Sequence, residues 1–316
     1  MLVRNAFVFT CDCAQSPEQL AEVLAGRRYS GIGELDAEQI GWVNPKEFEG
    51  GPLVHVVDSL TLIAVQKETK IIPASMVKKR LIATTAEIEQ REGRSLSRKE
   101  RTEIRKQVYE SLLPAAPTRT KLTFGVLHRS RRQLIVLTTS QKCVDEFLGL
   151  FADSYMKRNL RPSFGKLRTI TPPHLKMTDW LANKVCDEGF ELGVDCELAH
   201  EKSKVRYTLL ELDRPEIRDH LQEGKVPVKL GLRHHSTTTF VLACDGADSD
   251  LVFSKIDYGE NEGKPDSEAS PDEVFDSDLL FSVSEFLEIA NELFQVFGGI
   301  APDAVTFLDG ATDAIE

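Results

Sequence analysis

Residues 71–114 decide how this chain is built, and they read IIPASMVKKRLIATTAEIEQREGRSLSRKERTEIRKQVYESLLP. Mostly apolar side chains recur at helical spacing on either side of Gly93: Val77, Leu81, Thr85 and Ile88 before it, and Ile104, Val108 and Leu112 after it. Ser97 and Glu100 form the pattern of a capping box, and Pro114 ends the second periodic run. The stretch therefore predicts a helical hairpin with a narrow apolar seam, projecting from the body.

The predicted hairpin is basic, whereas the rest of the chain is acidic. Residues 67–132 contain 17 Lys and Arg against 7 Asp and Glu, although the whole chain has a net charge of −11. Residues 245–316 contain 19 acidic residues and only two lysines. A net acidic chain normally argues against nucleic acid as a partner. Because the charges are segregated, we instead expect a polyanion-binding surface on the hairpin; a solvated helical face is the alternative.

The composition predicts a soluble globular protein. The 316 residues are 41% hydrophobic and 28% charged, which suits roughly two domains of ordinary size. No apolar run reaches the ~20 residues of a membrane helix, and the first residues do not resemble a signal peptide. Six cysteines are too few for a disulfide scaffold. We expect a reduced, cytoplasmic protein that does not contact membranes.

The remaining sequence mixes strand and helix patterns, and it predicts the α+β class, with antiparallel sheets and packed helices. Strands are expected at 2–10, 53–57, 59–66, 121–127, 133–138, 205–210, 226–232 and 237–244. Helices are expected after Ser16-Pro17, around Val144 to Phe151, after Asp213 with Glu216 at its third position, and from Ser282 to Gly298-Gly299. Residues 257–278 are expected to form an acidic loop.

The same patterns divide the chain into five parts. These are an N-terminal α+β region (1–75), the basic hairpin (76–116), a continuation of the N-terminal region (117–190), a second α+β region (191–256), and an acidic linker with a C-terminal helix (257–316).

No set of catalytic, cofactor-binding or metal-binding residues is recognisable. The sequence lacks a glycine-rich phosphate loop, a GxSxG elbow and an HExxH motif, so we expect no enzyme activity and no cofactor. Cys11 and Cys13 lack the second ligand pair that a zinc site needs. His234 and His235 fall between two predicted strands, where solvent-exposed imidazoles at a hairpin tip are favoured over a metal site.

The candidate DNA-binding residues are the cations of the hairpin and of the strand that follows it. They are Lys78, Lys79, Arg80, Arg91, Arg94, Arg98, Lys99, Arg101, Arg105, Lys106, Arg119 and Lys121. Without base-reading motifs, such cations contact phosphates, which provides affinity but no sequence preference.

Seven short motifs follow the order of one known family along nearly the whole chain. They are Gly41-Trp42-Val43-Asn44-Pro45, Lys67-Glu68-Thr69-Lys70-Ile71-Ile72-Pro73 before Val77-Lys78, Gly93-Arg94-Ser95-Leu96, Ser111-Leu112-Leu113-Pro114, Thr178-Asp179-Trp180, Gly189-Phe190 and Glu223-Gly224-Lys225. Together they resemble the bacterial recombination-associated RdgC family.

The resemblance implies a horseshoe-shaped subunit that pairs with a second copy into a closed ring. Such a homodimer encircles double-stranded DNA without sequence preference and restrains recombinase filaments through the shared DNA, without a cofactor or a catalytic step. It also implies a nucleoid-associated location, and single-stranded DNA is a further possible ligand. Three positions need comment: Arg94 corresponds to a DNA-binding arginine, Pro117 replaces an aromatic residue at the ring closure, and Leu209-Leu210 replaces a polar, basic pair.

Two other functions remain open from the residues themselves. The basic hairpin could dock an acidic protein, including the acidic C-terminal region of this chain. The chain could also be a nuclease or another DNA-processing enzyme.

Overall fold

This computed structural model describes residues 1–12, 15–47, 50–158, 160, 163–244, 251–259 and 269–301. The strands are β1 (Ala6–Asp12), β2 (Glu38–Val43), β3 (His55–Val57), β4 (Leu60–Lys70), β5 (Thr118–His128), β6 (Gln133–Leu137), β7 (Ser163–Lys166), β8 (Phe190–His200), β9 (Ser203–Tyr207), β10 (Val226–His234), β11 (Thr238–Ala243) and β12 (Val252–Asp257). The helices are α1 (Pro17–Ala25), α2 (Ala74–Glu92), α3 (Arg98–Leu112), α4 (Gln141–Met156), α5 (Pro173–Asn183), α6 (Pro215–Gln222) and α7 (Pro271–Val296).

All of these strands join one antiparallel sheet. Its spatial order is β2-β4-β5-β6-β1-β12-β11-β10-β8-β9, with β3 paired to β4 and β7 paired to β1. The predicted α+β class is therefore confirmed, and the expected antiparallel sheets are parts of a single sheet. The five-part division of the chain stays a prediction.

The middle of the sheet is apolar on both faces. Phe7 and Phe9 of β1 pack into one core together with α1 and α4, whereas Ala6 and Val8 pack into a second core with α5 and α7. Helices thus cover both faces of the central strands, which is why these strands read as nearly continuous apolar runs.

Helix α7 begins earlier than the sequence predicted. The prediction placed its start at Ser282, but the helix begins at Pro271, because Ser270 and Glu273 form a capping box with backbone contacts of 3.3 and 2.8 Å. Ser282 lies inside the helix, where its buried hydroxyl accepts a hydrogen bond from the backbone N–H of Val3 at 3.1 Å. Part of the predicted acidic loop, residues 260–268, lies outside the described residues.

Other local predictions differ from the structure. Asp213 does not cap α6, since Arg214 occupies that position and Glu216 is the second helical residue. Five elements were not predicted: β2, β7, β8, β12 and α5. Strand β8 escaped notice because Asp195 and Glu197 interrupt its apolar pattern, and their cationic partners come from other strands.

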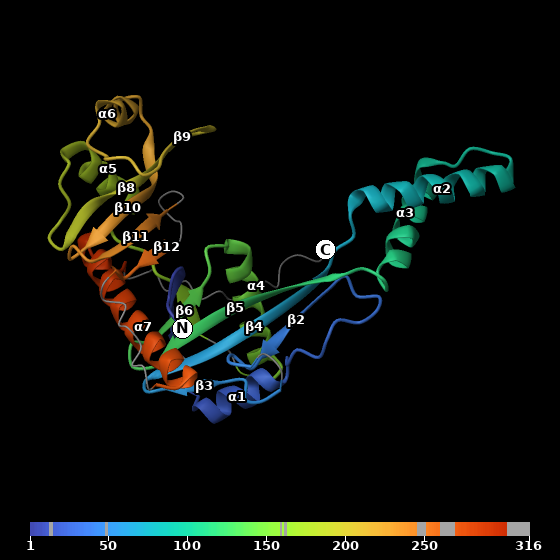
Figure 1. The fold of residues 1–316 in the computed structure, drawn as a ribbon, viewed down its shortest axis with the longest axis horizontal. Helices are drawn as coiled ribbons and strands as arrows, with labels where there is room; N and C mark the ends of the chain where they lie inside the picture. The colour runs from blue at the N-terminus through green and yellow to red at the C-terminus, as the bar shows by residue number, and fades with distance from the viewer. Residues whose placement is uncertain are drawn as a thin grey trace.

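The elements follow an open curve (Figure 1). Helices α2 and α3 lie beyond one end of the long strands β4 and β5, and strands β8 to β10 with α5 and α6 lie at the opposite end of the molecule. Helix α7 runs from the neighbourhood of β3 to that of β11, along both halves of the sheet. Among the described helices, none has the length and apolarity needed to cross a membrane.

Candidate nucleic-acid interface

Helices α2 and α3 are defined by strong local signals. Gly93 adopts φ +66°, a left-handed conformation that favours glycine, and its N–H donates to the Glu89 carbonyl at 2.9 Å. Ser97 then begins α3 through a capping box with Glu100. The two helices share a small apolar cluster whose buried members are Val77, Leu96, Ile104 and Val108. With so few residues buried, most of the surface of these helices remains available to a partner.

All twelve predicted DNA-binding side chains belong to exposed residues. They are Lys78, Lys79, Arg80, Arg91, Arg94, Arg98, Lys99, Arg101, Arg105, Lys106, Arg119 and Lys121. Arg94 and Arg101 form ion pairs, whereas the other ten form none with any residue that the structure describes. Their charges are therefore not offset by close acidic partners.

Arg94 is held by two carboxylates. Its guanidinium contacts both Glu100 oxygens, at 3.0 and 2.6 Å, and lies 2.8 Å from Glu92. Hydrogen bonds from Arg94 and then from Ser97 lower the pKa of Glu100 to about 2, so this carboxylate stays ionised. The charge of Arg94 is thus largely balanced within the hairpin, although the family resemblance implies that this position contacts DNA.

Arg101 is also paired. It lies 3.1 Å from Glu89, whose same oxygen accepts the backbone N–H of Leu96 at 2.9 Å. This ion pair joins α2 to α3 across the hairpin. Arg101 therefore has a structural partner that Arg98 and Arg105, about one helical turn away on either side in α3, do not have among the described residues.

A hollow of about 720 Å³ lies between α2 and α3. Its wall combines apolar side chains with three of the predicted cations: Ile72, Ala74, Val77, Leu81 and Tyr109, together with Lys78, Arg105, Lys106 and Thr102. The structure therefore brings cations from both helices to the rim of one concave surface.

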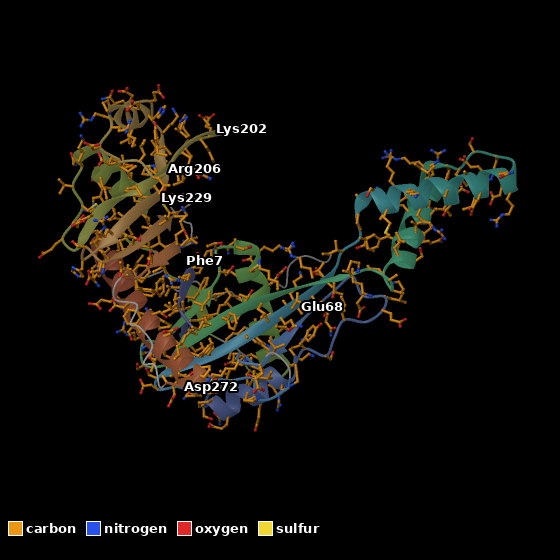
Figure 2. All side chains as sticks on the ribbon, in the orientation of Figure 1. Phe7, Glu68, Lys202, Arg206, Lys229 and Asp272 are labelled. Carbon is orange, nitrogen blue, oxygen red and sulfur yellow. The ribbon has the colours of Figure 1, made fainter. Side chains whose placement is uncertain are left out.

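A second group of cations lies at the opposite end of the molecule, and the sequence analysis missed it. Figure 2 shows Lys202, Arg206 and Lys229 along the side of strands β8 to β10 that faces the open part of the curve. Lys204 belongs to the same strand as Arg206. Alternating cations at 202, 204 and 206 were the available signal, since alternate residues share a face of a strand. Because the residues around these cations have a net negative charge, the regional charge count did not reveal them.

Three of these cations share one buried carboxylate, Glu197. Arg206 donates to it at 2.9 and 2.6 Å, Lys229 at 3.2 Å, and Lys204 lies 3.7 Å away. Burial raises the pKa of Glu197, but hydrogen bonds from Arg206 and Lys229 outweigh this and hold it below its usual value. Three positive charges against one negative charge leave this group cationic.

Leu209 and Pro117, where the chain departs from the family pattern, lie in different structural environments. Leu209 is 82% exposed at φ +53°, and its N–H donates to Asp195 at 3.2 Å. The Pro117 carbonyl accepts a hydrogen bond from the Ile71 N–H at 2.8 Å, where α3 returns to the sheet.

Possible metal ligands form one group among the described residues: His234, His235 and Glu292. Solvent-exposed imidazoles were expected here. That is correct for His235, whose side chain is 58% exposed, and wrong for His234, which is 5% exposed because it packs against Phe190. Cys13 lies outside the described residues, so the expectation for the Cys11 and Cys13 pair stays untested.

The fold and these surfaces define an α+β protein with one large antiparallel sheet and exposed cations at both ends. A family model described as "Putative exonuclease, RdgC" matches residues 1–300. The chain belongs to the RdgC family.

Several curated relatives, each named Recombination-associated protein RdgC, are similar over most of their length. The protein from Aeromonas hydrophila subsp. hydrophila is 29% identical, over 92% of this chain and 95% of the relative. The protein from Shewanella oneidensis is 30% identical over 90% of this chain and 92% of the relative. The protein from Bordetella parapertussis is 29% identical over 90% and 94%.

Proposed function

We propose that this protein binds double-stranded DNA without sequence preference and acts in recombination. The observation that carries the proposal is the set of ten exposed cations on α2, α3 and the beginning of β5 that form no ion pair with any described residue. Cations of this kind neutralise phosphates, and binding then releases counterions from DNA. The names of the relatives, all recombination-associated, support the same process.

The second cationic group extends the proposed DNA surface. Lys202, Lys204, Arg206 and Lys229 lie at the opposite end of the open curve from α2 and α3. Cations at both ends favour a duplex that lies within the curve. We further propose that a second copy of the chain completes a ring around the DNA, in the nucleoid of the cytoplasm. A bound ring would restrain a recombinase by occupying the DNA that it needs.

The test is a gel-shift titration with unrelated duplexes and with single strands, at several salt concentrations. We expect similar affinities for all duplex sequences and a linear fall of log K with log salt, with a slope of roughly −0.9 per phosphate contacted. A strong preference for one sequence, or no binding at low salt, would overturn the proposal.

Charge variants locate the surface. Lys79→Gln with Arg98→Gln removes two exposed cations that have no ion pair within the described part of the chain, and should reduce the salt slope by up to about 2. Arg131→Gln with Lys142→Gln is the matched control, because it removes the same charge elsewhere. Glu100→Gln should strengthen binding, since it removes one of the two negative charges that offset Arg94 and leaves only Glu92, while glutamine can still complete the capping box. If the first double variant and its control reduced the salt slope equally, the DNA surface would have to lie elsewhere on the protein.

An exonuclease is the second candidate function, because the family model carries that description. Two-metal nucleases place acidic ligands beside the DNA, whereas the one candidate ligand group in the described ranges contains two histidines and one glutamate. We therefore propose binding without cleavage. Incubation of labelled DNA with Mg²⁺ or Mn²⁺ separates the two functions, because shortened DNA would establish the nuclease and intact, retarded DNA supports binding.

A further inference from the structure

Two histidines and a glutamate from separate elements meet at one corner of the molecule. His234 ends β10, His235 follows in the turn to β11, and Glu292 belongs to α7. His234 Nε2 lies 2.8 Å from Glu292 Oε2, and His235 Nε2 lies 3.8 Å from Glu292 Oε1. One ligand atom from each residue lies within 4.8 Å of the others.

These separations fit the first coordination shell of a metal ion. In a tetrahedral site with bonds of about 2.0–2.2 Å, ligand atoms lie roughly 3.4 Å apart. The two observed distances, 2.8 and 3.8 Å, are close to that value, but they end on different oxygens of the Glu292 carboxylate. A rotation of the carboxylate and of the exposed His235 ring would bring one oxygen and both imidazole nitrogens around one ion, which would replace the hydrogen bond between His234 and Glu292.

The turn that carries the histidines has an unusual backbone. His235 and Ser236 adopt φ +44° and +61°, the pattern of a type I′ turn, for which asparagine and glycine are the favoured residues. His235 also donates its N–H to the Gly189 carbonyl at 2.9 Å. This backbone brings the two imidazoles together, with ring centroids 4.1 Å apart, although neighbouring strand residues normally point to opposite faces.

Neighbouring residues bury His234, whereas His235 stays accessible to solvent. The ring of His234 packs against Phe190, with centroids 5.1 Å apart, whereas His235 is open to solvent. Gly189 borders the group at φ +86°, and a Cβ there would lie 3.3 Å from Glu292 Oε2 and from the His235 ring. The glycine therefore avoids a close contact with two of the three ligand residues.

We propose that His234, His235 and Glu292 bind one divalent transition-metal ion, with Zn²⁺ as the best match. Imidazole nitrogens and a carboxylate are preferred zinc ligands, and a water molecule would complete the tetrahedron. The ion joins the β10–β11 turn to α7, so its role is to hold this helix against the sheet.

This site is separate from the cationic surfaces. Phe190, which pairs with His234, lies at one end of β8, and His200, beside Lys202, lies at the other. A strand of that length extends about 30 Å. The metal site is therefore independent of the proposed DNA binding, and either can fail without the other.

The experiment uses the full chain without a histidine tag, stripped of metal by a chelator. Titration with Co²⁺, followed by displacement with Zn²⁺, should reveal one saturable site per chain with the visible absorption of tetrahedral cobalt. His235→Ala should weaken binding at least about tenfold, because it removes one of three ligands. Zn²⁺ in excess should raise Tm by about 5 °C in the original protein and not in this variant.

His220→Ala is the matched control. His220 also lies beside a glutamate, with Nδ1 3.1 Å from Glu223, but among the described residues it belongs to no group of three candidate ligands. Its variant should bind Co²⁺ as the original protein does. Absence of saturable binding, unchanged affinity in His235→Ala, or loss of binding in His220→Ala would overturn the proposal. Circular dichroism confirms that both variants are folded.

Discussion

Glu197 is a buried carboxylate on β8 that holds three cations from neighbouring strands. Because its pKa in the folded protein lies below the ordinary value of 4.5, its ionised form stabilises the fold at neutral pH. That contribution is complete above about pH 4.5 and is lost as the pH falls through the folded pKa. The same carboxylate also offsets part of the positive charge on this end of the molecule.

Glu197→Gln should therefore have opposite effects on stability and on DNA binding. The free energy of unfolding at pH 7 should fall by about 2 kcal/mol, since charged hydrogen bonds are lost. The difference from the original protein should shrink below about pH 4, and DNA should bind more tightly at low salt. Urea unfolding at pH 7 and pH 3.5, together with gel shifts, measures these changes.

Glu191→Gln is the control for this prediction. Glu191 forms an exposed ion pair with Arg233 at 3.6 Å, and such pairs contribute little to stability. A stability loss for Glu197→Gln that stays the same at both pH values would contradict the assigned role of its ionised form.

At the scale of elements, α2 and α3 depend on few buried side chains. Ile104 is one of four buried members of their shared cluster, and it lies outside the two large cores of the sheet. The hairpin should therefore open more easily than the body of the protein.

Ile104→Ala should destabilise the hairpin locally by about 2–4 kcal/mol. Hydrogen exchange in α2 and α3 should accelerate, while exchange in α4 and α7 should change little, and DNA affinity should fall. Ile82→Ala is the control, because Ile82 is 61% exposed. Equal acceleration throughout the chain would show that the hairpin unfolds together with the body.

Several elements were predictable because their signals are local. Ser16 with Gln19 and Ser97 with Glu100 form the expected capping boxes, and Asp58 forms the expected turn between β3 and β4. For α7 the sequence predicted a start at Ser282 and missed the capping box at Ser270. The correct choice depends on burial, since Ser282 contacts the backbone of Val3.

At the scale of the whole molecule, the open curve places cations at both ends. If two such molecules close around a duplex, bound protein should slide off a linear duplex with free ends and remain on a closed circle. Sedimentation of the protein with linear and circular forms of one plasmid at moderate salt measures this difference. Equal retention on both forms would contradict a closed ring.

The sequence alone determined the helices capped by Ser16 and Ser97, the α+β class and the basic character of residues 67–132, because these depend on neighbouring residues or on composition. Only the tertiary structure decided the order of the described strands, the cations around Glu197, and the meeting of His234 and His235 with Glu292. Those arrangements join residues from separate strands and from α7. Strand pairing and helix packing bring them together, and no local pattern encodes which strands become neighbours.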